Sequence, residues 1–192
     1  GPWLVAFSFA VYSGQWLAVI GFLPSIYAQA GLSGAATGAL TALAAAINMV
    51  GNIASGRLLQ RGARAPMLLC AGFVTMGLGT VAAFAEVHGG GLSPLVRYAA
   101  VLLFSMIGGV IPGTLFSLAV KLAPTERTVS TTVGWMQQWS SFGQFIGPPL
   151  VAWVASRVGG WQWTWAVTGA CSLLGLALAG QIGRLLKSPS HQ

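Results

Sequence analysis

Long hydrophobic runs separated by short polar segments dominate this chain. A helix needs about 20 mostly apolar residues to cross the hydrocarbon core of a bilayer, and six runs approach or exceed that length. The six runs cover residues 3–27, 35–56, 66–85, 94–120, 129–155 and 163–183. The pattern predicts an all-α, polytopic membrane protein in which residues 1–192 form one bundle of six transmembrane helices.

Composition supports lipid as the solvent. Only 6% of the residues are charged, 55% are hydrophobic and the mean hydropathy is +0.77, whereas a soluble domain is about 25% charged. Lipid offers no partner to unpaired backbone groups, and the alternation typical of a barrel strand is missing, so the spans are expected to be helices. The basic residues lie singly or in threes between apolar runs, which argues against nucleic acid as a partner.

The basic residues also predict the orientation. With six spans, seven lysines and arginines fall on one side of the membrane and two on the other. The larger set is Arg57, Arg61, Arg64, Lys121, Arg127, Arg184 and Lys187, and the smaller set is Arg97 and Arg157. Because positive loops stay inside, both termini are predicted to be cytoplasmic, in the inner (plasma) membrane of the cell.

Few side chains are suited to catalysis. The acids, histidines and cysteines are Glu86, Glu126, His88, His191, Cys70 and Cys171. The acids fall at span ends, the histidines in a loop and the tail, and the cysteines inside apolar runs, where small core residues are typical. No paired carboxylates, zinc ligands or Ser–His pair can be assembled within the bilayer, so we expect neither an enzyme nor a metal or cofactor.

The predicted spans contain amide and aromatic residues instead. Tyr12 and Gln15 lie in the first run, Asn48 in the second and Gln138 in the fifth. Polar groups in a membrane helix are costly unless they meet another helix or water. These four residues are therefore candidates for a solvated central cavity, and interhelical hydrogen bonding is the alternative.

Glycine and proline mark two irregular places. Residues 108–113 of the fourth run include Pro112, which predicts a kink because proline removes a backbone hydrogen bond. In the fifth run, Gly143 and Gly147 form a small-xxx-small face, and Pro148 begins a Pro-Pro pair that predicts a break. Tight packing would explain both, and so would a protein that rocks between two states.

Three motifs resemble those of the major facilitator superfamily. The first follows the second run, where the sequence offers Gly56, Leu58, Arg61, Gly62 and Arg64, with Gln60 in place of the family's acid. The second is residues 124–127, Pro-Thr-Glu-Arg, and the third combines Gly143 with the Gly147-Pro148 pair. They occur in the order and on the side expected for this family. The degenerate first motif and the short tail resemble the C-terminal six-helix half of such transporters. The sequences of residues 56–62 and 108–113 are similar to the cyanate-permease-like branch of the family.

This resemblance implies a secondary transporter, or permease, that works by alternating access. Its partners would be the lipid bilayer, an N-terminal six-helix half and a small solute, with an anionic solute favoured if Arg97 attracts it. An interfacial anchor is the other interpretation of that arginine. In the family the first and fourth spans line the cavity, which implies roles for Tyr12, Gln15 and Ser105.

Two other functions are compatible with a six-helix membrane bundle. A homo-oligomeric six-helix channel or assembly protein would need no second half, but the chain begins with Gly1 rather than Met, which favours a fragment of a longer protein. An intramembrane enzyme is disfavoured because the chain has no Asp and no histidine within a span.

Overall fold

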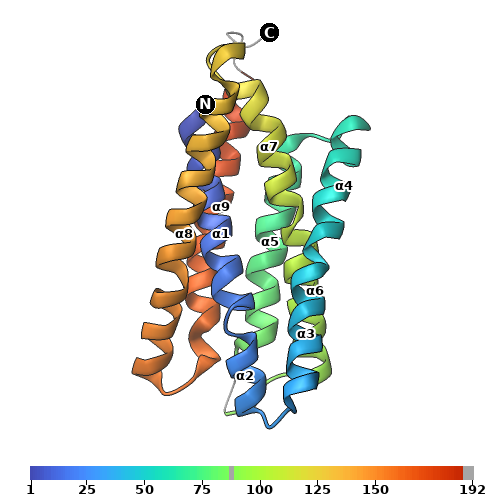
Figure 1. Ribbon diagram of the computed structural model, residues 1–192, viewed down its shortest axis with the longest axis vertical. Coiled ribbons are helices and arrows are strands. Elements are labelled where there is room, and N and C mark those ends of the chain that lie inside the picture. The colour runs from blue at the N-terminus through green and yellow to red at the C-terminus, as the bar shows by residue number, and fades with distance from the viewer. Residues whose placement is uncertain (87–88, 188–192) are drawn as a thin grey trace.

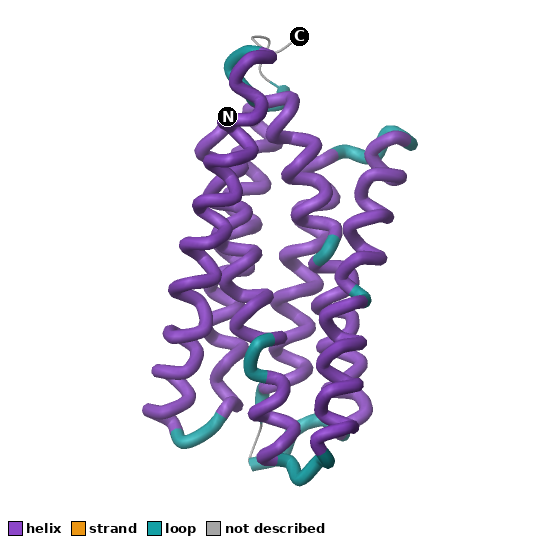
Figure 2. The backbone as a smooth tube through the Cα atoms, in the orientation of Figure 1, coloured by secondary structure: helices purple, strands orange, loops and turns teal. Residues whose placement is uncertain are grey.

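The computed structural model describes residues 1–86 and 89–187. Over these residues the chain forms a bundle of long helices that run up and down side by side, and none of the described residues forms a strand (Figures 1 and 2). Five helical segments of the described chain are long and apolar enough to cross a membrane. The prediction of an all-α fold is confirmed.

Three of the segments are pairs of helices that follow one another with a short interruption. The pairs are α1 (Pro2–Ile20) with α2 (Leu23–Gln29), α3 (Gly34–Ala46) with α4 (Asn48–Gln60), and α6 (Pro94–Gly108) with α7 (Val110–Leu122). The uninterrupted helices are α5 (Ala65–Phe84), α8 (Val129–Val158) and α9 (Thr164–Leu185), with 3-10 turns at Glu126–Thr128 and Trp161–Trp163. Gly1 and the end of α9 lie at the same end of the bundle (Figure 1).

Proline explains two of the interruptions. Pro24 has no N–H for the carbonyl of Ile20, four residues earlier, and α1 ends at that residue. Pro112 likewise leaves the carbonyl of Gly108 without its helical donor, and α6 ends there. The irregularity predicted at Pro112 of the fourth run is therefore present, as an interruption between α6 and α7.

The break predicted at the Pro-Pro pair of the fifth run is wrong. Helix α8 has 30 residues and continues through Pro148 and Pro149 to Val158, ending at Gly159 in the left-handed conformation. Prolines remove only local hydrogen bonds, and a membrane helix tolerates them where its neighbours support it. Here α1 lies along α8 and provides that support.

Close backbone approach holds α1 against α8. A Cβ atom added to Gly143 would overlap the carbonyl oxygen of Ala10, and one added to Gly147 would overlap the carbonyl of Gly14. Glycine is therefore required at both positions of α8 by the distance between the two backbones. This contact fits the small-xxx-small face predicted from the sequence.

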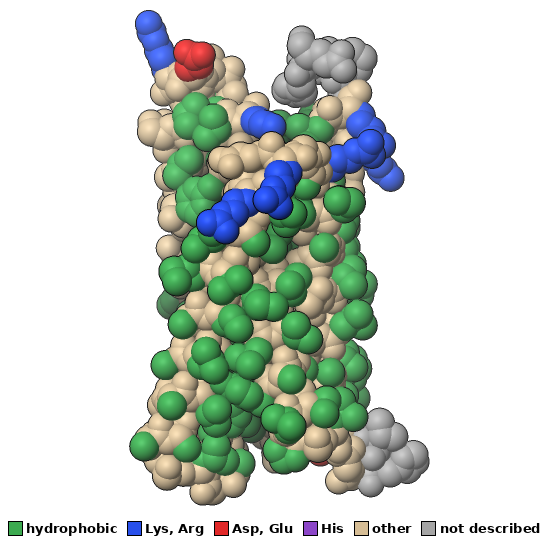
Figure 3. Space-filling model, turned by 90° about the vertical axis from the view of Figure 1, so that its right-hand side faces the viewer, with side chains coloured by type: hydrophobic (Ala, Val, Ile, Leu, Met, Phe, Trp, Pro, Cys, Tyr) green, Lys and Arg blue, Asp and Glu red, His purple; other side chains and the backbone are tan. Residues whose placement is uncertain are grey.

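Charge separates the two ends of the bundle. Lys and Arg side chains gather at the end of the bundle where α4 ends, and no Lys or Arg is seen in the middle of the same face, where many hydrophobic side chains lie (Figure 3). Arg97 and Glu86 lie at the opposite end and form an ion pair with an Nη2–Oε1 distance of 3.2 Å. The apolar belt between charged ends is the surface that a bilayer requires.

Candidate functional site

A network of polar side chains connects α1, α4 and α6 inside the bundle. The amide nitrogen Nδ2 of Asn48 donates to the hydroxyl of Tyr12 at 2.9 Å and to the backbone carbonyl of Ser105 at 2.8 Å. The indole Nε1 of Trp16 donates to Oγ of Ser105 at 3.1 Å. We call these four residues the Asn48 network. They come from the first, second and fourth predicted spans.

The network lies where two interrupted helix pairs cross. At this crossing a Cβ atom on Gly109 would overlap the carbonyl oxygen of Asn48, and one on Gly51 would overlap the carbonyl of Met106. One turn further, Gly113 leaves room for the hydroxyl of Ser55. The close backbone contact brings Asn48 within reach of the α6 carbonyls, and it coincides with the interruptions of both pairs.

A chain of hydrogen bonds extends the network along α4. Asn52 donates from Nδ2 to Oδ1 of Asn48 at 3.1 Å, one helical turn away, and Ser55 donates to the carbonyl of Asn52 at 2.7 Å. Tyr12 is 5% exposed, whereas Trp16 and Asn48 are half-buried. The site therefore consists of neutral donors and acceptors from three helices, of which Trp16 and Asn48 are partly exposed.

The chemistry available here is recognition by hydrogen bonds. Every side chain of the Asn48 network is neutral, and no group of three or more His, Cys, Asp or Glu suited to a metal occurs among residues 1–86 and 89–187. Both acidic residues of the chain, Glu86 and Glu126, lie outside the long helices. The arrangement has no obvious general acid or base.

Gln15 belongs to a different contact. Its side chain is 2% exposed and points to α9, where the hydroxyl of Ser172 donates to Oε1 at 3.0 Å. Its Nε2 group has no hydrogen-bond acceptor among the described residues. Gln15 therefore does not join Tyr12 and Asn48, although it lies less than one helical turn from Tyr12.

Gln138 lies apart from the other candidates, on the exposed side of α8. The signature residues also divide into two groups. Gly56, Arg61, Gly62 and Arg64 lie at or beyond the basic end of α4, where Gly62 adopts a left-handed conformation with φ of 89°. Gly143, Gly147 and Pro148 lie in α8, and Pro112 in α7 beside the crossing.

The candidates chosen from sequence omit Trp16, which belongs to the Asn48 network, and the serine pair Ser13 and Ser140. Trp16 follows Tyr12 by four residues on the same helical face, which was a usable signal. Ser13 and Ser140 share a hydrogen bond of 2.6 Å between their Oγ atoms, which ties α1 to α8. Serines are common in membrane helices as backbone-bonding residues, so nothing in the sequence singled out this pair.

Comparison with known proteins identifies the family of this chain. A search of curated proteins gives no significant match. The family model described as Major Facilitator Superfamily matches residues 5–189, nearly the whole sequence. The helical bundle, its apolar belt and this match agree with one another. The chain belongs to the major facilitator superfamily, a family of membrane transporters.

Proposed function

We propose that this chain is one six-helix half of a secondary transporter that moves a small anionic solute by alternating access, with the Asn48 network contributing to the solute site. The observation that carries the proposal is the position of this network. Its polar groups meet where two interrupted helix pairs cross, so a change in the crossing would move the groups that contact a solute.

Helix α8 supports the need for a second half. Its exposed residues include Gln137, Gln138, Ser141 and Gln144, which lie on one helical face because they are three or four residues apart. Lipid cannot solvate amides, so this face requires protein or water against it. Phe145, next to it, is 77% exposed and would be covered by the same partner.

The helix pair α3–α4 supports the same arrangement. Only 11% of its most apolar window is buried within the chain. Its exposed positions include Gly38, Ala39, Ala42 and Ala46, and small residues permit two helices to approach closely. A second six-helix half seated on α8 and α3–α4 would cover both surfaces. With the basic end facing the cytoplasm, Gly1 and the end of α9 would lie on that side of the inner membrane.

An anionic solute fits the charges of the chain. No acidic side chain lies within the long helices, and the Asn48 network keeps the O–H groups of Tyr12 and Ser105 as donors, since the N–H groups of Asn48 and Trp16 are already hydrogen-bonded. Donors suit an anion, and the absence of a carboxylate avoids repulsion. The solute would be small, since the network involves only a few side chains from each of three helices.

The test is uptake of labelled small anions into proteoliposomes that contain the complete natural protein. Asn48→Leu removes the three hydrogen bonds of the Asn48 side chain, and Trp16→Phe removes the bond to Ser105. Both variants are expected to reduce uptake at least tenfold. Thr75→Val, on α5 and outside the network, is the matched control that should transport normally.

Folding is followed by thermal stability in detergent, so that lost uptake can be separated from lost structure. Normal uptake by a folded Asn48→Leu or Trp16→Phe protein would refute the role of the network. Uptake by a homo-oligomer of this chain alone, with no second half, would instead favour the alternative function, a homo-oligomeric six-helix channel.

A further inference from the structure

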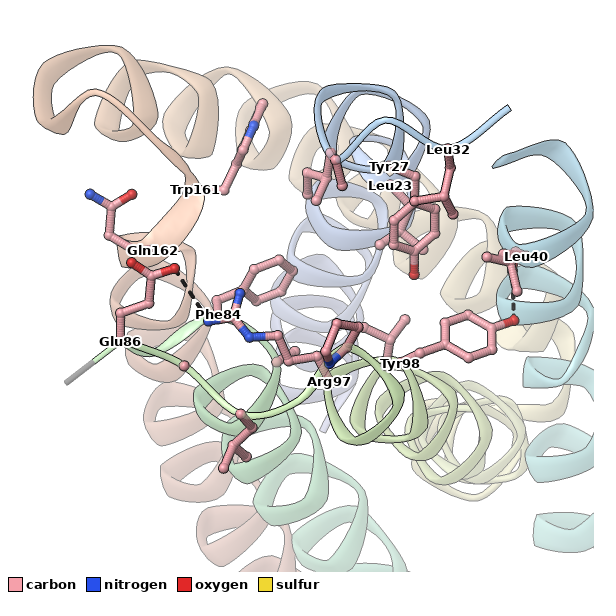
Figure 4. A pocket seen from close by; sticks show the side chains of 17 residues that line it. Leu23, Tyr27, Leu32, Leu40, Phe84, Glu86, Arg97, Tyr98, Trp161 and Gln162 are labelled. Atoms are coloured by element: carbon pink, nitrogen blue, oxygen red, sulfur yellow. Dashed lines mark hydrogen bonds and ion pairs between the residues drawn. The ribbon is translucent and has the colours of Figure 1, made fainter. Parts of the chain in front are cut away.

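A cavity of about 490 Å³ opens at one end of the bundle, opposite the end where most Lys and Arg side chains gather. Its walls come from α2, α3, the end of α5, α6 and the turn at Trp161–Trp163 (Figure 4). The lining is mainly apolar, and its volume lies within the range of about 300–1,000 Å³ typical of small-molecule sites. We call it the outer cavity. It is separate from the Asn48 network, none of whose residues lines it.

Polar contacts between elements hold these walls in place. The hydroxyl of Tyr98 on α6 donates to the carbonyl of Leu40 on α3 at 3.0 Å. The indole Nε1 of Trp161 donates to Oε1 of Gln29 on α2 at 3.0 Å. The ion pair of Arg97 joins α6 to the segment that follows α5. A cavity braced by three such contacts is a shaped site rather than a loose gap between loops.

Two polar groups in this cavity lack partners. Among residues 1–86 and 89–187, Nε of Arg97 and the hydroxyl of Tyr27 are buried and make no hydrogen bond. Figure 4 shows Arg97 of α6 running along one side of the cavity toward Glu86, and Tyr27 of α2 on the other side. Buried polar groups are normally satisfied, so a ligand with an acceptor oxygen would fill this need.

Glycine shapes the position of the arginine. A Cβ atom on Gly91 would overlap Nη2 of Arg97, so the guanidinium lies directly against the backbone of this residue. The ion pair with Glu86 uses only one of the five N–H donors of a guanidinium. Nη1 and Nη2 keep further N–H donors for a second acceptor, on a side chain that is 31% exposed.

From this geometry we propose that the outer cavity is a binding site for a small amphipathic monocarboxylate. Its carboxylate would accept hydrogen bonds from Arg97 and Tyr27, and its apolar body would lie against Leu23, Phe84 and Val101. A monoanion is favoured over a phosphate dianion because Glu86 stands beside the arginine and would repel the second charge. The site does not depend on transport by the Asn48 network.

The probe is 4-phenylbutyrate, and its neutral amide, 4-phenylbutyramide, is the matched ligand. Binding to the complete natural protein in phosphatidylcholine nanodiscs is measured by isothermal titration calorimetry, with empty nanodiscs subtracted. The acid is expected to bind with one-to-one stoichiometry and the amide at least about tenfold more weakly, as expected for hydrogen bonds to a charged group.

Two variants test the arginine by different routes. Arg97→Gln removes the charge, and Gly91→Ala displaces the guanidinium while keeping it; each is expected to weaken binding about tenfold or more. The controls are Arg157→Gln, which removes another arginine predicted on the same side, and Gly34→Ala, where an added Cβ meets open space. Both controls should bind like the natural protein.

Size-exclusion profiles establish that each variant is folded. If one of the two test variants does not fold, the other decides, and the comparison of acid with amide on the unmodified protein stands regardless. No binding of the acid, equal binding of acid and amide, or unchanged binding by folded Arg97→Gln or Gly91→Ala would overturn the proposal.

Discussion

The contact between α1 and α8 makes a sharp prediction for Gly143→Ala. The new methyl group would overlap the carbonyl oxygen of Ala10, which belongs to a helix backbone and cannot rotate away. The two helices must therefore separate. Forcing a methyl group into a tight contact costs about 1–3 kcal/mol of unfolding free energy.

Separation also weakens the neighbouring hydrogen bond between Ser13 and Ser140, whose oxygens are 2.6 Å apart. An interhelical bond of this kind contributes about 0.6 kcal/mol in a membrane protein. The combined loss for Gly143→Ala is thus about 1.6–3.6 kcal/mol. Its size rests mainly on the backbone clash, because the hydrogen bond is the smaller part.

The measurement is reversible unfolding of the complete protein in mixed micelles, followed by tryptophan fluorescence. Trp135 and Trp139 on α8 pack with Trp3 on α1, at ring-centroid distances of 4.9 and 5.9 Å, and report on this interface. The control is Gly180→Ala on α9, where an added Cβ meets nothing within 4 Å. Higher helix propensity should stabilise that variant by up to about 1 kcal/mol. Equal effects of the two substitutions would refute the packing argument.

Three further substitutions test other contacts by the same unfolding assay. Gly51→Ala should destabilise the protein by about 1–3 kcal/mol, because its methyl group would overlap the carbonyl of Met106 at the helix crossing; a neutral result would contradict that crossing. Thr168→Val should cost about 0.6 kcal/mol through loss of the 2.9 Å bond to Thr80, and a stabilising effect would count against it. Gly62→Ala should cost about 1 kcal/mol because φ is 89° there, and no loss would show that the turn is not left-handed.

The membrane character of this protein could be predicted from hydrophobic run lengths alone. A bilayer imposes one minimum length on every spanning helix and excludes unpaired backbone, so local composition determines the class of fold. Helix α8 shows the limit of that approach. Its amides lower its hydropathy, and it is absent from the five segments that qualify as membrane spans in the described chain.

Local sequence was less reliable for helix irregularities. Pro112 coincides with an interrupted helix, whereas Pro148 and Pro149 lie inside an uninterrupted one. The same residue type has different outcomes because proline removes hydrogen bonds in both places, while neighbouring packing decides whether the helix stays straight. The interruption at Ile47 contains no proline, and it coincides with the crossing against Gly109.

Local sequence predicts some contacts of the candidate site and not others. Asn48 and Asn52 are four residues apart, a spacing that puts them on one helical face, and they bond at 3.1 Å. Spacing along a helix could not show that Asn48 meets Tyr12, 36 residues away, while Gln15 turns toward Ser172 on α9. Residues three apart on one helix point in directions that differ by about 60°, enough to face different neighbours.

The sequence by itself determined the solvent of this protein, its helical class and the sidedness of its charges, because these follow from local composition and from the thickness of a bilayer. Only the tertiary structure decided which polar groups meet and where a cavity forms. Those outcomes depend on helix crossings set by glycine contacts between distant segments, such as Gly51 with Met106 and Gly143 with Ala10. A contact between distant segments leaves no periodic trace in either one.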